Sequence, residues 1–285
     1  MELEYITNLA KGVRLDPLEQ LKNEILDPNC RYFAVYGEGR SLRAGELTAW
    51  QVKSLGKRIS VFDTLAFPDY DSLISMQDKQ RKMIMLLISG SGTTGSVVDT
   101  AKDLRKLSDK YKGKYLKLVA VTSHPEKDLG KYAHECIMIP GRTKDSVEKD
   151  WAARQVNPEN PTMGDNFEEK ALLHLHAMVL SAQTGYEIKD IVNAEVEELK
   201  KDLKDEIDSG NYDQVKHYLK RSRNAGVFCH GRRQSNCVAQ MVANRMNHYG
   251  IKTYVLGETT TPGIWSCWGL IVDSIAWEIL ILHGP

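Results

Sequence analysis

The sequence has no hydrophobic run long enough to cross a membrane, and its first residues, MELEYITNLAKG, lack the apolar core of a secretion signal. It also lacks an excess of either charge. The 285 residues include 38 basic and 38 acidic side chains, so no global field would attract nucleic acid or an anionic membrane. We therefore expect a soluble protein that binds neither.

Cysteine is scarce, and its pattern argues against two common uses. The five cysteines are an odd number, and no two form a CxxC motif. This argues against a disulfide framework and against a zinc site, and it is typical of reduced thiols in a cytoplasm. No spacing of histidines and carboxylates indicates a metal site either. The sequence predicts a cytoplasmic protein without metal or other cofactor.

The segment 83–102 has the strongest local pattern. Residues 83–88 are apolar and predict a buried strand, and from Val97 the apolar side chains recur at helical spacing. Between the two lies the loop Ser89-Gly90-Ser91-Gly92-Thr93-Thr94. A strand, a small polar loop and a helix leave backbone N–H groups free at a helix N-terminus, where the helix dipole favours an anion. The loop therefore predicts a phosphate site, and an ordinary tight turn is the alternative.

Strands alternate with helices along the first half of the chain, which predicts a doubly wound, flavodoxin-like three-layer α/β fold with a parallel sheet. The expected strands are 31–37, 58–62, 83–88, 116–122 and 136–139, and the expected helices are 42–55, 94–111, a short one near Leu129 and 167–186. In such sheets ligands bind beyond the C-terminal ends of the strands. The two glycine-containing loops, 37–41 and 89–94, both lie there.

The second half of the chain contains a partial internal repeat. A shift of 194 residues places Gly37 on Gly231 and Ser41 on Ser235, and four further identities follow in one ungapped span. The copy lacks a loop like 89–94 after its third strand, 268–273. We therefore expect four segments: an N-terminal helical extension (1–29), a complete domain (30–186), a charged helical linker (187–224) and a partial β-α-β unit (225–285). The partial unit must pack on the first domain, on the charged helix or on a partner chain.

Several motifs resemble one family. The loop 89–94 is similar to the phosphate loop of sugar isomerase (SIS) domains, with Thr93 where that family often has Glu. The turn Gly37-Glu38-Gly39-Arg40-Ser41 and the helix that opens with Phe167-Glu168 resemble the 6-phospho-3-hexuloisomerases of that family. Gly257-Glu258-Thr-Thr-Thr261-Pro262 resembles their GETTTP loop, but it lies in the second copy. The resemblance covers 30–185 as a complete domain and 225–273 as a partial one.

The resemblance implies roles for particular residues. The phosphate of a phosphosugar would be bound by Ser41, Ser89, Gly90, Ser91, Gly92, Thr93 and Thr94, with Arg40 and Glu258 as further substrate contacts. Glu168 would move a proton between adjacent sugar carbons. Aldose–ketose isomerisation through an enediol needs one such base and no redox cofactor. The alternative for Glu168 is an acid that stabilises the helix dipole.

Two histidines are also candidates for the chemistry. His124 follows the strand 116–122 and lies on the ligand side, where it would open a sugar ring or contact hydroxyls. His230 ends the first strand of the second copy, beside a second glycine turn. His174 and His176 lie in mid-helix among leucines, where a packing role is expected.

Two functions are consistent with these patterns. The leading one is a phosphosugar isomerase that assembles as a homo-oligomer, because sites in the resembled family draw residues from two domains or subunits. The alternative is a non-catalytic sensor or regulatory subunit that binds a sugar phosphate on the same fold. A nucleotide-binding α/β protein is disfavoured, because no acidic residue in the context of a dinucleotide fingerprint accompanies the glycines.

Overall fold

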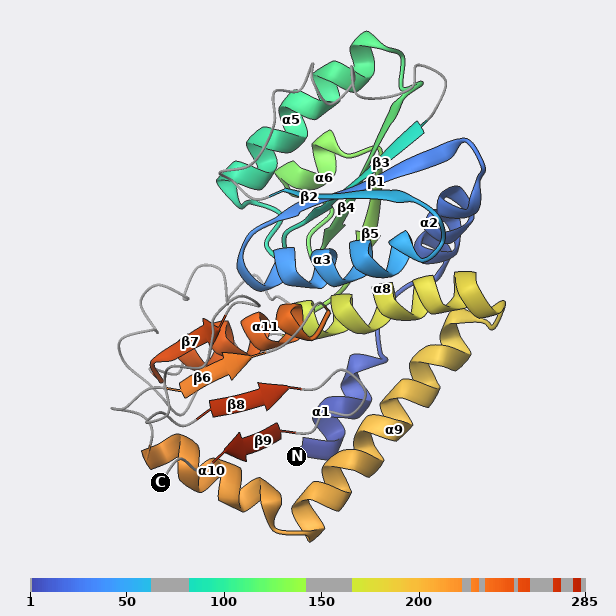
Figure 1. The fold of residues 1–285 in the computed structure, drawn as a ribbon. Helices are drawn as coiled ribbons and strands as arrows, with labels where there is room; N and C mark the ends of the chain where they lie inside the picture. The colour runs from blue at the N-terminus through green and yellow to red at the C-terminus, as the bar shows by residue number, and fades with distance from the viewer. Residues whose placement is uncertain are drawn as a thin grey trace.

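The computed structural model describes residues 2–62, 82–141, 166–221, 227–230, 234–248, 251–256, 269–272 and 279–282. Its larger unit is a five-stranded parallel sheet in the order β2-β1-β3-β4-β5 (Figure 1). The strands are β1 (Cys30–Gly37), β2 (Arg58–Phe62), β3 (Lys82–Ile88), β4 (Leu116–Thr122) and β5 (Glu135–Met138). This is the predicted flavodoxin-like order, and the α/β fold class is confirmed.

The central strands are mostly apolar because both faces of the sheet are covered. Val35 and Leu86 point into a core shared with α2 (Asp16–Leu26), α3 (Gly39–Lys53) and α8 (Phe167–Thr184). Their neighbours Ala34 and Met85 point into the opposite core, with α5 (Gly95–Lys110) and α6 (Asp128–Tyr132). Helices on the two faces make the three layers.

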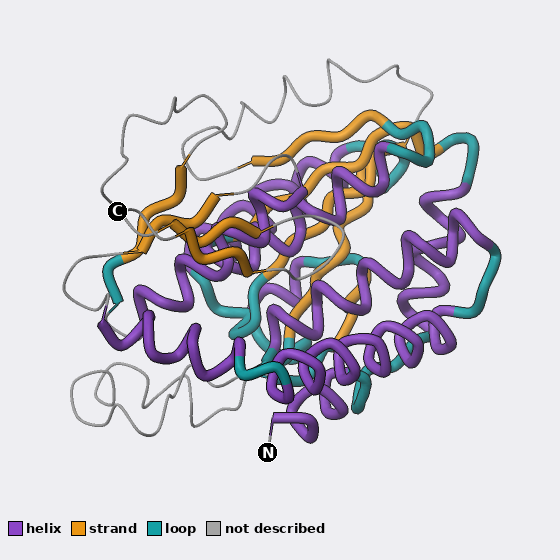
Figure 2. The backbone as a smooth tube through the Cα atoms, turned by 60° about the horizontal axis from the view of Figure 1, so that its bottom comes forward, coloured by secondary structure: helices purple, strands orange, loops and turns teal. Residues whose placement is uncertain are grey.

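The N-terminal and linking helices extend the first layer. α1 (Glu2–Leu9) packs on α8 and on α9 (Ile188–Asp208), which continues into α10 (Asn211–Arg221). In Figure 2 the N-terminus lies among these helices, away from the strands. Within the described ranges, no helix is long and apolar enough to cross a bilayer.

The smaller unit is a second sheet in the order β7-β6-β8-β9. It contains β6 (Val227–His230), α11 (Gln234–His248), β7 (Thr253–Leu256), β8 (Gly269–Val272) and β9 (Ile279–Leu282). The first three strands are parallel and repeat the local order β2-β1-β3. β9 is antiparallel to β8. Its antiparallel direction ends the likeness to the first unit, in which parallel β4 follows.

The strand register carries the same internal shift as the sequence. In the first unit Phe33 pairs with Ile59, and in the second Val227 pairs with Thr253. Both members of the second pair lie 194 residues after those of the first. The helices α3 and α11 that follow the first strands correspond as well.

The second unit packs on the first through these corresponding helices, since α11 contacts α3 (Figure 1). Its small core contains Val227, Cys229, Ala239 and Ala243, and Leu219 of α10 packs against it. Of the three packing partners expected from the sequence, the first domain and the charged helix are therefore both used.

Three elements differ from the expectations. α3 begins at Gly39 and not at Leu42, so Arg40 and Ser41 lie in its first turn instead of in the preceding loop. The charged segment after residue 187 is two helices separated at Ser209 and Gly210. The strand β9 was not predicted, because a four-residue apolar run gives no sign of the partner with which it pairs.

Candidate functional site

The predicted site residues gather at one edge of the first sheet, where its parallel strands end. Gly37 at the end of β1 is paired with Ile88 at the end of β3. The loop 89–94 continues from β3, and Ser123 and His124 follow β4 beside it. This edge lies at the N-termini of α3 and α5, and the dipoles of both helices favour negative charge there.

The loop 89–94 is held in place by its backbone. Ser89 N–H donates to the carbonyl of Val121, and Ser123 N–H donates to that of Gly90, each at 3.1 Å. Gly92 has φ of +66°, and a Cβ on it would lie 3.0 Å from Thr122 Oγ1 and 3.1 Å from the carbonyl oxygen of His124. A glycine is therefore required at position 92, both for its backbone conformation and for its neighbours.

The hydroxyls of the loop contact one another at the start of α5. Ser89 Oγ lies 2.8 Å from Thr94 Oγ1 and 3.4 Å from Ser91 Oγ, and the N–H and hydroxyl of Thr93 each donate to Ser91 Oγ at 3.2 Å. Thr94 is the N-cap of α5, but its side chain makes no capping hydrogen bond. The first N–H groups of α5 thus have no side-chain cap, which is the usual arrangement of an anion site.

The glycines of this loop also have the GxGxxG spacing of dinucleotide-binding loops, at positions 90, 92 and 95. In those proteins an acidic residue about 20 positions further on binds the ribose. Here the neighbouring strand β4 ends in Thr122, followed by Ser123 and His124. The acid is missing from that strand end, so the spacing alone does not indicate a dinucleotide.

The turn before α3 is tied to the same loop region. The hydroxyl of Ser96, in the first turn of α5, donates to Glu38 Oε1. Ser41 lies in the first turn of α3 and is buried. The predicted phosphate residues therefore come from two helix N-termini that a side-chain hydrogen bond links.

A buried ion-pair cluster lies where α3 meets α8. Arg40 Nη2 donates to Glu168 Oε2 and Arg40 Nη1 donates to Glu169 Oε1, both at 2.9 Å. The Arg40 side chain is only 4% exposed, and the Glu168 side chain 8%. One guanidinium thus binds two consecutive carboxylates, and sequence reasoning missed Glu169 because its partner is far away in the chain.

The start of α8 is fixed by close packing. Phe167 is fully buried, and the backbone of Gly141, just after β5, approaches it so closely that a Cβ on Gly141 would lie 2.5 Å from the backbone nitrogen of Phe167. Lys170, one residue after the two glutamates, donates from Nζ to the carbonyl of Lys11 at 2.9 Å. Burial lowers the pKa of Lys170. These contacts hold Glu168 and Glu169 at the sheet edge.

The histidines fall into separate places. His124 is buried beside the loop, with Nδ1 3.4 Å from Glu126 Oε1. His230 ends β6 in the second sheet, and Glu258 lies outside the described residues.

The other two histidines lie in α8. His174 is buried, and its Nδ1 lies 2.9 Å from the carbonyl oxygen of Lys170. Burial lowers the pKa of His174. His176 is half-buried and lies 2.7 Å from Gln51 Nε2.

Metal ligands do not cluster in the part of the chain that the structure describes. Among those residues, no group of three or more His, Cys, Asp or Glu side chains is placed to hold an ion. The groups at the sheet edge include hydroxyls, backbone N–H groups, the Arg40 guanidinium and the carboxylates of Glu168 and Glu169. These groups suit a phosphorylated ligand and proton transfer.

Known proteins resemble this chain in sequence and in fold. No family model matches the chain. An uncharacterized protein of Archaeoglobus fulgidus is 30% identical over 176 residues, 62% of this chain and 83% of that protein. The 3-hexulose-6-phosphate isomerase of Bacillus subtilis is 26% identical over 178 residues, again 62% of this chain and 83% of the relative.

Solved structures show the same fold. A candidate phosphosugar isomerase from Silicibacter pomeroyi matches with a TM-score of 0.63 at 13% identity, over 95% of this chain and 74% of that one. At that identity the likeness concerns the fold. The sequence relatives, taken together with the parallel sheet and the Ser/Gly loop at its edge, identify the family. The chain belongs to the sugar isomerase (SIS) domain family.

Proposed function

We propose that this protein is a phosphosugar isomerase that interconverts an aldose phosphate and a ketose phosphate, or two ketose phosphates, through an enediol. The observation that carries the proposal is the buried carboxylate of Glu168 at the same sheet edge as the loop 89–94. A binding protein needs only the loop, whereas an isomerase also needs a base beside it.

The phosphate would bind at the N-termini of α3 and α5. Loop residues Ser89 to Thr94 offer hydroxyls and backbone N–H groups, and Ser41 lies in the first turn of α3. Anions are stabilised by such helix ends. In this arrangement Gly92 lets the loop lie against the residues that follow β4, where the carbonyl oxygen of His124 is its neighbour. The His124 side chain would contact the sugar.

Glu168 would take a proton from one sugar carbon and return it to the next. A single base on one face of the enediol is sufficient, because the proton removed is the proton delivered. His124 would assist ring opening. His230 and Glu258 belong to the second unit. They would contact the substrate only if that unit lies against the proposed site of this chain or of a partner chain.

We also propose the wider organisation that accompanies this activity. The chain would divide into segments 1–29, 30–186, 187–224 and 225–285, with the last closing on the first domain through α11. It would act in the cytoplasm as a homo-oligomer, and deletion of 225–285 would alter assembly and activity. Gel filtration with light scattering on the full chain tests the assembly directly.

Proton exchange tests the activity. The protein is incubated in D₂O with hexose, hexulose and pentose phosphates, fructose 6-phosphate included, and the carbon-bound protons are followed by NMR. We expect exchange or conversion with one sugar class, and its loss in Glu168→Gln while binding remains. Binding shifts without exchange for every sugar would contradict the isomerase.

One observation favours a second candidate, a sugar-phosphate sensor. The carboxylate of Glu168 is bound by a buried guanidinium, as a purely structural ion pair would be. A sensor would bind the same phosphosugars and show no exchange. Both functions leave sugar-phosphate binding in Glu168→Gln, so the exchange shown or not shown by the wild-type chain separates the sensor from the enzyme.

A further inference from the structure

Arg40 connects the start of α3 with the start of α8. It follows the turn that is tied to α5 by the hydrogen bond between Glu38 and Ser96, and it precedes Ser41 in the first turn of α3. Its guanidinium reaches across to the first turn of α8, where it meets Glu168 and Glu169. The same residue is therefore adjacent in sequence to a phosphate candidate and in direct contact with the candidate base.

One guanidinium faces two carboxylates in this cluster, in a place where Arg40 and Glu168 are almost fully buried. Glu169 is less buried, with a side-chain exposure of 29%. A dianionic phosphate at the loop 89–94 adds further negative charge nearby, and a guanidinium is the strongest available partner for it.

The two arms of Arg40 make different contacts. Nη2 binds Glu168, the proposed base, whereas Nη1 binds Glu169, which has no place in the proposed chemistry. A guanidinium has five N–H donors, so it can exchange one partner and keep another. The more exposed Glu169 is suited to remain the anchor, while the buried Glu168 exchanges its guanidinium for substrate.

We propose that Arg40 is a phosphate ligand that couples substrate binding to the release of the base. A phosphate bound at the loop 89–94 draws the Nη2 arm of Arg40 away from Glu168, and Glu169 keeps the Nη1 arm in place. Glu168 becomes available only when a phosphorylated sugar occupies the loop. This inference rests on the proposed function for the position of the phosphate and for the role of Glu168.

Competition between Glu168 and phosphate for one guanidinium predicts an unusual binding result. Glu168→Gln removes the competitor, so it should bind inorganic phosphate about tenfold more tightly than the wild-type chain, a coupling typical of residues in direct contact. Arg40→Met should bind phosphate at least tenfold more weakly. Isothermal titration calorimetry of the full chain with inorganic phosphate measures both.

A double-mutant cycle separates this coupling from a simple loss of negative charge. In the Arg40→Met background, Glu168→Gln should no longer improve phosphate binding. Glu38→Gln is the matched control, because Glu38 is another carboxylate at the same edge and its Oε1 accepts a hydrogen bond from Ser96. A pure charge effect would make Glu38→Gln tighten binding as much as Glu168→Gln does.

Glu169 acts through Arg40 and is a positioning residue. In Glu169→Gln the guanidinium loses its anchor and stays on Glu168, so phosphate binding should weaken several-fold, and Glu169→Asp should restore it in part. With an active isomerase, kcat should fall in Glu169→Gln by more than KM changes. If Glu169 had only a structural role, Glu169→Gln would lower thermal stability but would change neither the phosphate affinity nor kcat relative to KM.

The outcomes distinguish this inference from the proposed function. If the wild type binds phosphate but the effects of Arg40→Met and Glu168→Gln are additive, the coupling is wrong and the isomerase proposal is unaffected. If neither the wild type nor Glu168→Gln binds phosphate, both proposals are wrong.

Circular dichroism checks folding of the variants. If Arg40→Met does not fold because two buried carboxylates face each other, Arg40→Lys replaces it. Lysine cannot bind two acceptors as a fixed fork, so the coupling should again disappear.

Discussion

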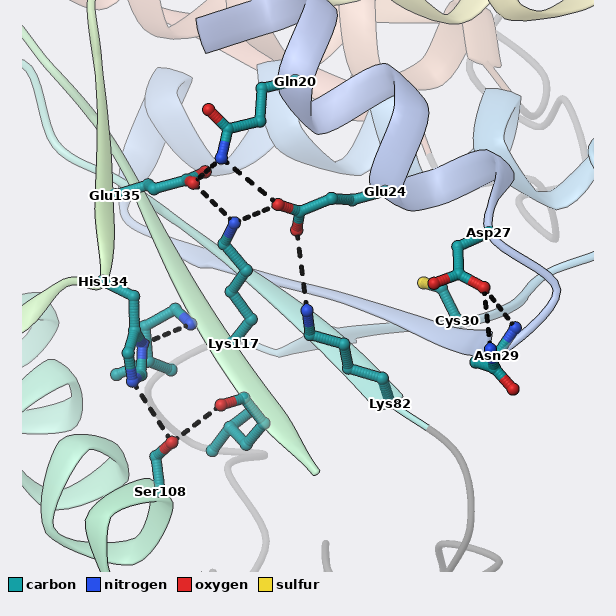
Figure 3. A network of polar contacts seen from close by, with 12 residues as sticks. Gln20, Glu24, Asp27, Asn29, Cys30, Lys82, Ser108, Lys117, His134 and Glu135 are labelled. Atoms are coloured by element: carbon teal, nitrogen blue, oxygen red, sulfur yellow. Dashed lines mark hydrogen bonds and ion pairs between the residues drawn. The ribbon is translucent and has the colours of Figure 1, made fainter. Parts of the chain in front are cut away.

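The Nδ1 atom of His134 accepts a hydrogen bond of 2.9 Å from the backbone N–H of Leu118 (Figure 3). Its Nε2 lies 3.3 Å from the hydroxyl of Ser108, which donates to the carbonyl of Leu116 at 2.7 Å. A ring nitrogen that accepts cannot carry a proton, so this imidazole is neutral in the folded chain.

Stability should fall in mild acid because of His134. Burial, followed by the charge of Arg105, lowers the pKa of His134 from its ordinary value of 6.5. Below that pH the unfolded chain binds a proton that the folded chain does not, so the stabilisation is complete above pH 6.5 and is lost as the pH falls. Thermal melts between pH 7.5 and 5 measure the slope.

Two variants test whether His134 causes this dependence of stability on pH: His134→Gln, and His217→Gln as the control. His217 is exposed, so its variant controls for the loss of a histidine at the surface. His134→Gln should be less stable at pH 7.5 by about 1–3 kcal/mol and should have a flatter pH dependence. Equal slopes in His134→Gln and the wild type would rule out His134 as a source of the acid sensitivity.

Gly92→Ala should disturb the loop beyond the cost of its backbone conformation. Gly92 and Gly113 have similar φ values, +66° and +68°, but an added Cβ would meet other atoms within 4 Å at Gly92 and none at Gly113. Gly113→Ala should therefore cost about 1–2 kcal/mol, the conformational penalty alone. Gly92→Ala should cost more and should weaken binding of inorganic phosphate. Equal losses of stability in the two variants would contradict the close packing of the loop.

Lys117→Met should be strongly destabilising. The Lys117 ammonium lies 2.7 Å from Glu135 and also pairs with Glu24, and its side chain is 11% exposed (Figure 3). Without it two carboxylates face each other in a largely buried place, a change that costs about 3–5 kcal/mol. Lys106→Met, which removes an exposed pair with Asp103, should change stability by less than about 1 kcal/mol. Urea unfolding compares the two.

Cys237 should report whether the second unit stays docked on α3. Burial raises the pKa of its thiol to about 12, and Glu46 of α3 adds to the effect. Because the thiolate is the reactive form, iodoacetamide at pH 8 should modify the half-buried Cys136 much faster than Cys237, as mass spectrometry would show. In guanidinium chloride the two rates should become similar. Fast labelling of Cys237 in the native protein would show that α11 leaves α3.

The positions of the strands could be predicted from the sequence because apolar runs with sharp ends define them. The strands 58–62 and 116–122 were predicted with the observed bounds. Gly37 and Ser89 were placed at the ligand edge because ligands in a doubly wound sheet bind beyond the C-terminal strand ends. The same rule predicts that the loop 89–94 and the turn before α3 lie at one edge, and the hydrogen bond between Ser96 and Glu38 joins them there.

The repeat could also be predicted from the sequence, since a single shift of 194 residues places glycines and a serine at the ends of corresponding elements. The last strand of the second sheet could not be predicted, because nothing in the local sequence of Ile279–Leu282 specifies an antiparallel partner. The packing of α11 on α3 was one of three open choices. Packing between two units depends on their whole surfaces, and the sequence pattern of either helix shows only that it is amphipathic.

The sequence alone was enough for the fold class and for the position of the loop 89–94, because periodicity and small polar residues act over a few positions. Glu168 became the candidate base only through the resemblance of the start of its helix to a known family. Only the tertiary structure decided which side chains meet across the sheet edge. Arg40 and Glu168 are separated by 128 residues, and their 2.9 Å contact depends on where α8 crosses α3. Such a contact is set by the packing of whole elements, and therefore no local pattern contains it.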